Sequence, residues 1–139
     1  MNPSYHPAVA ALLLRVTLGT MFVAHALLKY FVFTLPGTAQ FFASLGLPEF
    51  LGYVVFGAEL VGGALLILGV QVRAVALALV PIMLGATWAH LGNGWLFSAK
   101  GGGWEYPAFW TVALVVQALL GAGAYALAPA RPATVLRTA

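Results

Sequence analysis

The stretch that decides the fold runs from Val54 to Val70 and reads Val-Val-Phe-Gly-Ala-Glu-Leu-Val-Gly-Gly-Ala-Leu-Leu-Ile-Leu-Gly-Val. It has the apolarity and length of a membrane-spanning helix, yet it contains a carboxylate, Glu59. An ionisable side chain at bilayer depth costs about 2.5–3.5 kcal/mol on insertion scales. We therefore expect Glu59 to face protein or water rather than lipid, and to have a partner elsewhere in the chain.

The composition of the whole chain is that of an integral membrane protein. Of its 139 residues, 63% are hydrophobic and 6% are charged. A soluble domain usually carries about 25% charged residues, so this chain could not cover a globular surface with polar groups. The length fits a single membrane domain over residues 1–139. The net charge of +3 comes from six basic and three acidic side chains and does not indicate nucleic-acid binding.

The sequence contains no cysteine. This excludes disulfides, thiolate metal sites, iron–sulfur ligation and thiol redox chemistry carried by this chain alone. The sequence also shows no haem, flavin or metal motif. Electrons for any redox reaction would therefore have to come from a partner protein.

Four apolar stretches are long enough to cross a bilayer, because about 20 helical residues span a hydrocarbon core of about 30 Å. We expect membrane-spanning helices at residues 9–33, 50–70, 74–91 and 107–127. A half-apolar stretch at residues 38–45 lies between turn-forming Pro-Gly and Gly-Leu-Pro sequences, and is expected as a short amphipathic segment at the interface. The sequence thus predicts an all-α membrane protein, a bundle of four transmembrane helices.

Four spans would place both termini on the same side of the membrane. The basic residues then divide between the two faces as Arg15, Arg73, Arg131 and Arg137 against Lys29 and Lys100. Positively charged residues favour the cytoplasm, so we expect cytoplasmic termini and two long external loops. An aromatic belt is expected at the external face, formed by Trp88, Trp95, Trp104, Tyr106 and Trp110.

One side chain is well placed to meet Glu59. At about 1.5 Å per residue, His25 and Glu59 lie at similar depths below the external ends of their helices. His25 belongs to a set with 3-4-3-4 spacing, which shares one helix face: Arg15, Leu18, Phe22, His25 and Lys29. We therefore interpret this face as the one turned into the bundle, and Glu59 and His25 as the candidate catalytic pair.

Further polar side chains extend from this pair toward the external loops. His90 closes the third expected span, Glu105 opens the fourth, and Gln117 is an amide inside the fourth. The candidate ligand-binding or entrance residues of this polar funnel are Lys29, His90, Glu105, Tyr106 and Gln117. We interpret Arg15 and Arg73 as structural anchors near the cytoplasmic ends of their helices.

Two other readings of the buried acid remain open. A buried carboxylate paired with a histidine or lysine can serve only to fix helix register. His25, His90 and Glu59 also form a ligand set that metals use, two histidines and a carboxylate. However, the sequence lacks the His-x-x-x-His and Glu-x-x-His spacings, and we expect no metal site.

From about Leu12 to Leu127 the chain resembles the DoxX family of small four-helix membrane proteins. The motifs that carry the likeness are Leu14-Arg15, Phe22-Val23-Ala24-His25, Lys29, Gly46-Leu47-Pro48, Gly57-Ala58-Glu59-Leu60-Val61-Gly62-Gly63, Arg73, His90-x-x-Asn93-Gly94-Trp95 and Gly103-Trp104-Glu105-Tyr106-Pro107. The resemblance implies a multi-pass protein of the bacterial cytoplasmic (inner) membrane. One branch of the family is associated with the membrane subunit of a thiosulfate:quinone oxidoreductase, and another with a membrane redox complex that handles oxidative stress.

The resemblance thus favours a quinone-interacting subunit of an oxidoreductase complex, in which Glu59 and His25 exchange protons with a quinone headgroup. Expected partners are the lipid bilayer and either other protein subunits or further copies of the chain. Two alternatives stay open: a non-catalytic accessory or assembly subunit of a larger membrane complex, and a conduit for a small molecule or ion. The sequence does not decide whether the chain is itself an enzyme.

Overall fold

The computed structural model describes residues 5–128 of the chain. Its elements are α1 (Tyr5–Phe31), α2 (Leu35–Ser44), α3 (Phe50–Leu68), α4 (Val72–His90), the 3-10 helix η1 (Leu91–Asn93) and α5 (Glu105–Leu120). The described residues form no strand, so the expectation of an all-α protein is confirmed. Arg131 and Arg137, which entered the prediction of membrane orientation, lie outside the described residues.

Three of the helices are long and apolar enough to cross a membrane. These segments are His6–Phe31, Phe50–Leu68 and Val72–Asn93. The helix α5 is also apolar but has 16 residues, fewer than a straight crossing needs at about 1.5 Å per residue. The structure therefore supports a multi-pass membrane protein, and the fourth crossing stays a prediction.

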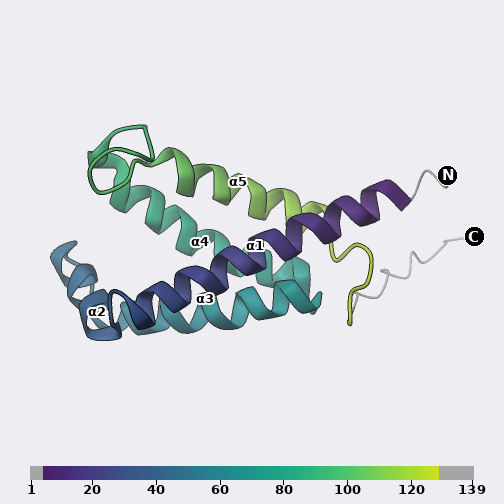
Figure 1. The fold of residues 1–139 in the computed structure, drawn as a ribbon, viewed down its shortest axis with the longest axis horizontal. Coiled ribbons are helices and arrows are strands. Elements are labelled where there is room, and N and C mark those ends of the chain that lie inside the picture. Colours follow the sequence, from purple (N-terminus) through teal and green to yellow (C-terminus); the bar gives the residue numbers. More distant parts are fainter. Residues whose placement is uncertain (1–4, 129–139) are drawn as a thin grey trace, which may run out of the picture.

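The helices are arranged as two pairs (Figure 1). In one pair α1 packs along α3, and in the other α4 packs along α5, while α2 folds back against α3. The pairs lie close together at the end that carries the turn between α3 and α4, and their ribbons diverge toward the end that carries α2 and η1. Side chains on α1 and α3 therefore meet face to face along most of their length.

The core lies where the two pairs meet. Its buried members come from every long helix: Leu18, Phe22, Leu66, Val72, Ala76, Leu79, Met83, Trp110, Ala113, Leu114 and Ala118. Small residues bring α1 and α3 into close contact, since a Cβ atom added at Gly63 would lie 2.8 Å from the backbone oxygen of Gly19. This close approach brings polar side chains on α1 within reach of α3.

The end of α5 differs from its expected position. The helix stops at Leu120 rather than near residue 127, and Gly121 and Gly123 then adopt positive φ angles of 81° and 69°. The chain beyond it returns along the other pair, where Ala124 N donates to Ala8 O at 2.9 Å and Leu127 N donates to Leu68 O at 3.1 Å. The apolar sequence after Leu120 thus joins the two helix pairs instead of extending the helix.

Arg15 holds this junction together. Its buried guanidinium donates from Nε to Ala122 O at 2.8 Å, and from Nη2 to Ala124 O at 2.9 Å and Tyr125 O at 3.1 Å. Its Nη1 donates to two carbonyls in the last turn of α3, those of Leu66 and Ile67. The last carbonyls of a helix have no partner in the next turn and carry partial negative charge. They therefore accept hydrogen bonds from Arg15 and balance part of its positive charge in the absence of a carboxylate partner among the described residues.

We expect Arg15→Lys to destabilise the protein strongly, because a lysine ammonium cannot reproduce the planar fork that contacts both segments. Each hydrogen bond to a charged group contributes about 1.5–3 kcal/mol, so the loss of several should cost about 3 kcal/mol or more. The measurement is the temperature at which half of the detergent-solubilised protein leaves its monodisperse peak.

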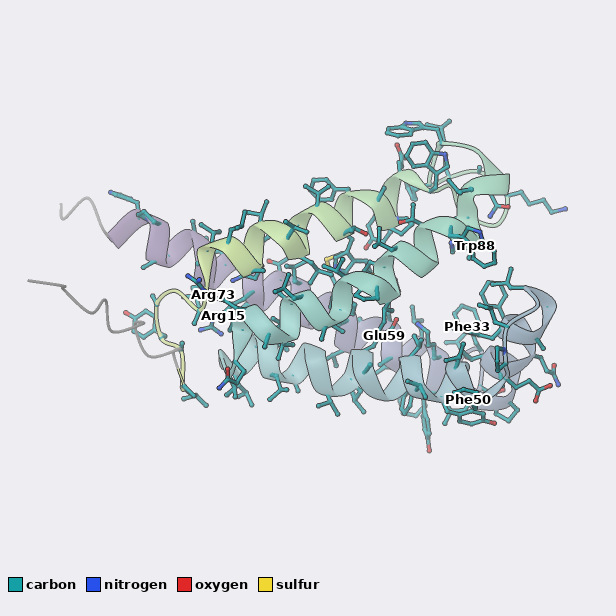
Figure 2. The ribbon with its side chains drawn as sticks, turned by 180° about the vertical axis from the view of Figure 1, so that it is seen from behind. Arg15, Phe33, Phe50, Glu59, Arg73 and Trp88 are labelled. Carbon is teal, nitrogen blue, oxygen red and sulfur yellow. The ribbon has the colours of Figure 1, made fainter. Side chains whose placement is uncertain are left out.

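Arg73→Lys is the matched control for this substitution. Arg73 is exposed at the same end of the bundle as Arg15, and no hydrogen bond joins its side chain to another described residue (Figure 2). A midpoint that falls equally in both variants would contradict the structural role of the Arg15 contacts.

Candidate functional site

Glu59 lies in α3 roughly midway between the Arg15 end and the Phe50 end of the bundle (Figure 2). Its partner is Lys29 of α1, whose Nζ donates to Glu59 Oε1 at 2.9 Å and to Oε2 at 2.7 Å. Both side chains are largely enclosed, with exposed fractions of 18% for Lys29 and 7% for Glu59. This is the one ion pair between side chains in the part of the chain that the structure describes.

The direct partner of Glu59 therefore differs from the expected one. His25 is the partner expected from the sequence, because it and Glu59 lie at similar depths below the ends of their helices. Lys29 stands one helical turn beyond His25 on the same face of α1, and its long side chain bridges the distance to Glu59. The buried acid is thus neutralised by an ammonium group and not by an imidazole.

His25 lies within electrostatic range of Glu59 but forms its own hydrogen bond within α1. Its Nδ1 is 2.9 Å from Met21 O. A carbonyl oxygen only accepts a hydrogen bond, so Nδ1 carries a proton and donates a hydrogen bond to Met21 O. Nε2 is the second nitrogen of the ring. No described residue forms a hydrogen bond with this Nε2 atom, which is therefore available to exchange a proton.

Aromatic rings of α5 surround His25. The ring of Trp110 meets it edge-on with centroids 4.9 Å apart, and that of Tyr106 stacks at 6.4 Å. Trp110 is buried, with an exposed fraction of 3%, so the prediction that it belongs to an interfacial aromatic belt is wrong. Its 3-4-3 spacing with Pro107, Leu114 and Gln117, which are all buried, is the signal that could have assigned it to the interior.

Two buried polar atoms of α5 lack a hydrogen-bond partner among the described residues. They are Trp110 Nε1 and Gln117 Oε1. The amide nitrogen of Gln117, Nε2, donates to Gly121 O at 2.7 Å. The Gln117 side chain therefore caps the C-terminal end of α5. Gln117 thus lies far along α5 from Glu105 and does not form part of an entrance next to the external loop.

The remaining candidate residues lie at the opposite end of the bundle from Arg15. His90 Nδ1 donates to Ala86 O at 2.7 Å, and Glu105 Oε1 accepts from Phe97 N at 2.8 Å. Glu105 and Tyr106 line a hollow of about 380 Å³ together with Trp95, Phe97 and Phe109. Tyr106 also contacts Trp110, with ring centroids 5.6 Å apart, and so connects this hollow with His25 through a series of rings.

The structure thus brings together part of the predicted funnel. Lys29, Glu59, His25 and Tyr106 form a group between α1, α3 and α5, whereas His90 contacts its own helix and lies near the loop between η1 and α5. Within residues 5–128, no group of three or more His, Cys, Asp or Glu side chains is placed to hold a metal ion. The Glu59 carboxylate and the Lys29 ammonium, which are in direct contact, can form hydrogen bonds and exchange protons.

A family model described as DoxX matches residues 10–92. The chain belongs to the DoxX family. The resemblance drawn from the motifs is thereby confirmed. The matched segment covers α1 from residue 10 onward and all of α2, α3 and α4. The Lys29–Glu59 ion pair, His25 and Arg15 therefore fall inside the family region. The hollow beside α5 falls outside it.

This DoxX protein is also similar to a protein of Bacillus subtilis (strain 168) that carries the name "Putative oxidoreductase CatD". The two are 41% identical over 86 residues, which cover 62% of this chain and 61% of the relative. The match thus spans about three fifths of the length of that curated relative. No solved structure matches the chain.

We expect the Lys29–Glu59 pair to be strongly coupled in stability. Lys29→Met leaves a buried carboxylate without a counter-charge, and Glu59→Gln leaves an ammonium in the same position, so each single change should cost about 3–5 kcal/mol. The double variant removes both charges and should be more stable than the sum of the single losses predicts. Thermal unfolding of all four proteins in detergent measures this difference.

Lys100→Met is the control for the loss of a lysine, because Lys100 is exposed in the loop between η1 and α5. Its substitution should leave the unfolding midpoint unchanged. Strictly additive effects of Lys29→Met and Glu59→Gln would show that the two side chains do not depend on each other.

Proposed function

We propose that this DoxX protein is a quinone-interacting membrane subunit of an oxidoreductase complex, and that Glu59 and His25 handle protons in it. The observation that carries the proposal is the Lys29–Glu59 pair enclosed at mid-depth of the bundle, with His25 nearby. Ionisable groups inside membrane segments are costly to maintain and are functional candidates for that reason. The name of the Bacillus subtilis relative, "Putative oxidoreductase CatD", supports a redox role.

The chain supplies groups suited to proton exchange. The Glu59 carboxylate accepts a proton, the Lys29 ammonium donates one, and the Nε2 position of His25 can do either. Reduction of a quinone takes up protons together with electrons, and its oxidation releases both. A carboxylate held by an ammonium, with an imidazole in electrostatic range, can therefore exchange protons with a quinone headgroup when one is bound.

A second observation fits a ligand with carbonyl oxygens. The indole Nε1 of Trp110 is a buried donor without an acceptor among the described residues, next to the ring of His25. Buried donors in proteins are nearly always hydrogen-bonded. A quinone carbonyl is an acceptor of the kind this indole lacks, so Trp110 would orient the headgroup and the neighbouring rings would exclude water.

We propose that the electrons come from another protein. The sequence has no cysteine, and no cluster of metal ligands lies among residues 5–128. We therefore propose that this chain acts with a redox-active partner subunit. The chain would contribute the membrane site and its protons, and the partner would contribute the electron donor.

The proposed arrangement in the bacterial inner membrane has α1, α3, α4 and α5 as four spans with both termini in the cytoplasm. Arg15 and Arg73 lie at one end of the bundle (Figure 2). Lys100 lies in the loop between η1 and α5, at the other end. The end with more arginine would face the cytoplasm by the positive-inside rule. The hollow beside α5 would then face the exterior.

Single cysteines test this orientation cleanly because the chain has none of its own. We expect a membrane-impermeant maleimide to label Glu49→Cys and Lys100→Cys on intact cells, and to label Arg73→Cys only after permeabilisation. Tyr125→Cys reports on the fourth crossing, since its position lies beyond α5 and is exposed. Labelling of Tyr125→Cys from outside would show that α5 does not cross the membrane.

We expect Glu59→Gln to lower quinone-dependent electron transfer by about a hundredfold or more, the range typical for loss of a general acid or base. The assay uses membranes from cells whose own copy carries the substitution, and follows reduction of an added short-chain quinone. Glu49→Gln is the control, because Glu49 is an exposed carboxylate at the start of α3. The amount of monodisperse protein extracted from each strain is measured in parallel.

The alternative function predicts another result in the same assay. Lys29 satisfies both oxygens of Glu59, a geometry that also suits a purely structural pair in an accessory or assembly subunit. In that case Glu59→Gln would change stability or association with partner proteins, while turnover per extracted molecule would stay at the level of the parent protein. That outcome would refute a proton-handling role for Glu59.

A further inference from the structure

The hollow lies at the start of α5, and of its lining residues only Tyr106 also contacts the proposed quinone site. Four of its five lining residues are aromatic, namely Trp95, Phe97, Tyr106 and Phe109, and the fifth is Glu105. It lies beyond the segment that the DoxX family model matches, which ends at residue 92. The family match therefore does not assign a role to the hollow, and its role is inferred from its own chemistry.

We propose that this hollow binds an alkylammonium group, of the kind carried by phospholipid headgroups and by free organic cations. The faces of aromatic rings attract cations through their quadrupole, and quaternary ammonium groups are recognised in this way by clusters of rings. Glu105 adds a full negative charge at the same place. Rings and a carboxylate together favour a positively charged organic group over a neutral or an anionic one.

The carboxylate is held in position and still has capacity to bind. Its Oε1 accepts a hydrogen bond from Phe97 N at 2.8 Å. Its Oε2 has no hydrogen-bond donor, and Glu105 forms no ion pair, within the part of the chain that the structure describes. Lys100 lies in the neighbouring loop but forms no ion pair with Glu105. The carboxylate can therefore pair with the positive charge of a ligand.

The loop that carries two of the rings is built onto the start of α5. Trp104 N donates to Gly94 O at 3.1 Å, and Glu105 N donates to Trp95 O at 3.2 Å. Trp95 also packs edge-on against Trp104, with centroids 4.6 Å apart, and Asn93 Nδ2 bonds to Gly101 O and Gly102 O. These contacts fix the loop so that its rings lie beside Glu105 before any ligand binds.

Two features speak against other ligand classes. Glu105 lies in the first turn of α5, where its charge already complements the positive end of the helix, so an anion would meet a carboxylate instead of a free helix terminus. The volume of about 380 Å³ suits a small headgroup, because ligand pockets usually measure about 300–1,000 Å³. A cationic headgroup satisfies both conditions.

The test is a titration of tetramethylammonium chloride into the full chain purified in a maltoside detergent, which contains no ammonium group. Tryptophan fluorescence follows binding, since Trp95 lines the hollow. We expect a saturable change that sodium chloride at the same ionic strength does not produce. The neutral analogue 3,3-dimethyl-1-butanol has the same shape without the charge and should bind much more weakly.

Glu105→Gln should weaken tetramethylammonium binding by about tenfold, within the range expected when a cation loses its charged partner in an aromatic site. The substituted amide oxygen can still accept from Phe97 N, so the fold should persist. Phe109→Ala is a second variant that removes an exposed ring and should also weaken binding. Glu49→Gln, which removes an exposed carboxylate outside the hollow, should bind like the parent protein.

A second arm identifies the source of the cation. The protein is reconstituted in nanodiscs that contain equal amounts of phosphatidylglycerol and phosphatidylethanolamine, and the lipids that remain bound after extraction are measured. Enrichment of phosphatidylethanolamine that tetramethylammonium displaces assigns a lipid headgroup, whereas tetramethylammonium binding without enrichment assigns a free organic cation. The proposal is overturned if the parent protein shows neither effect, or if Glu105→Gln binds as tightly as the parent.

Discussion

The hydrocarbon interior of a bilayer offers no water, so every polar group inside a membrane segment must find its partner within the protein. Two side chains of α1 meet this constraint at two places in the bundle. Arg15 bonds to carbonyls at the end of α3 and after α5, and Lys29 bonds to both oxygens of Glu59. The same face of α1 therefore joins the helix pairs near one end and neutralises the acid at mid-depth.

These two sets of contacts differ in what they can do chemically. The acceptors of Arg15 are backbone carbonyls, which do not exchange protons, and the guanidinium keeps its charge. The Lys29–Glu59 pair joins two groups that each gain or lose a proton, beside a histidine with an available ring nitrogen. For this reason Arg15 is suited to hold the fold, while the group around Glu59 is suited to chemistry.

The end of the bundle opposite Arg15 is built by different means. There a loop is closed by backbone hydrogen bonds and by the packing of Trp95 on Trp104. Two rings of this loop and two rings of α5 line one hollow together with the Glu105 carboxylate. Tyr106 belongs both to this hollow and to the rings around His25. The two proposed sites are therefore neighbours, although one is assigned to protons and a quinone and the other to an ammonium group.

The sequence by itself determined that this is an all-α membrane protein of the DoxX family, and that Arg15, His25 and Lys29 share an inward face of α1. It could do so because apolarity, spacing and motifs are local properties of a chain. Only the tertiary structure decided that Glu59 pairs with Lys29 rather than His25, that Trp110 is buried, and that α5 ends at Leu120. Those outcomes depend on how closely the helices approach and how far each side chain reaches, which residue spacing alone does not specify.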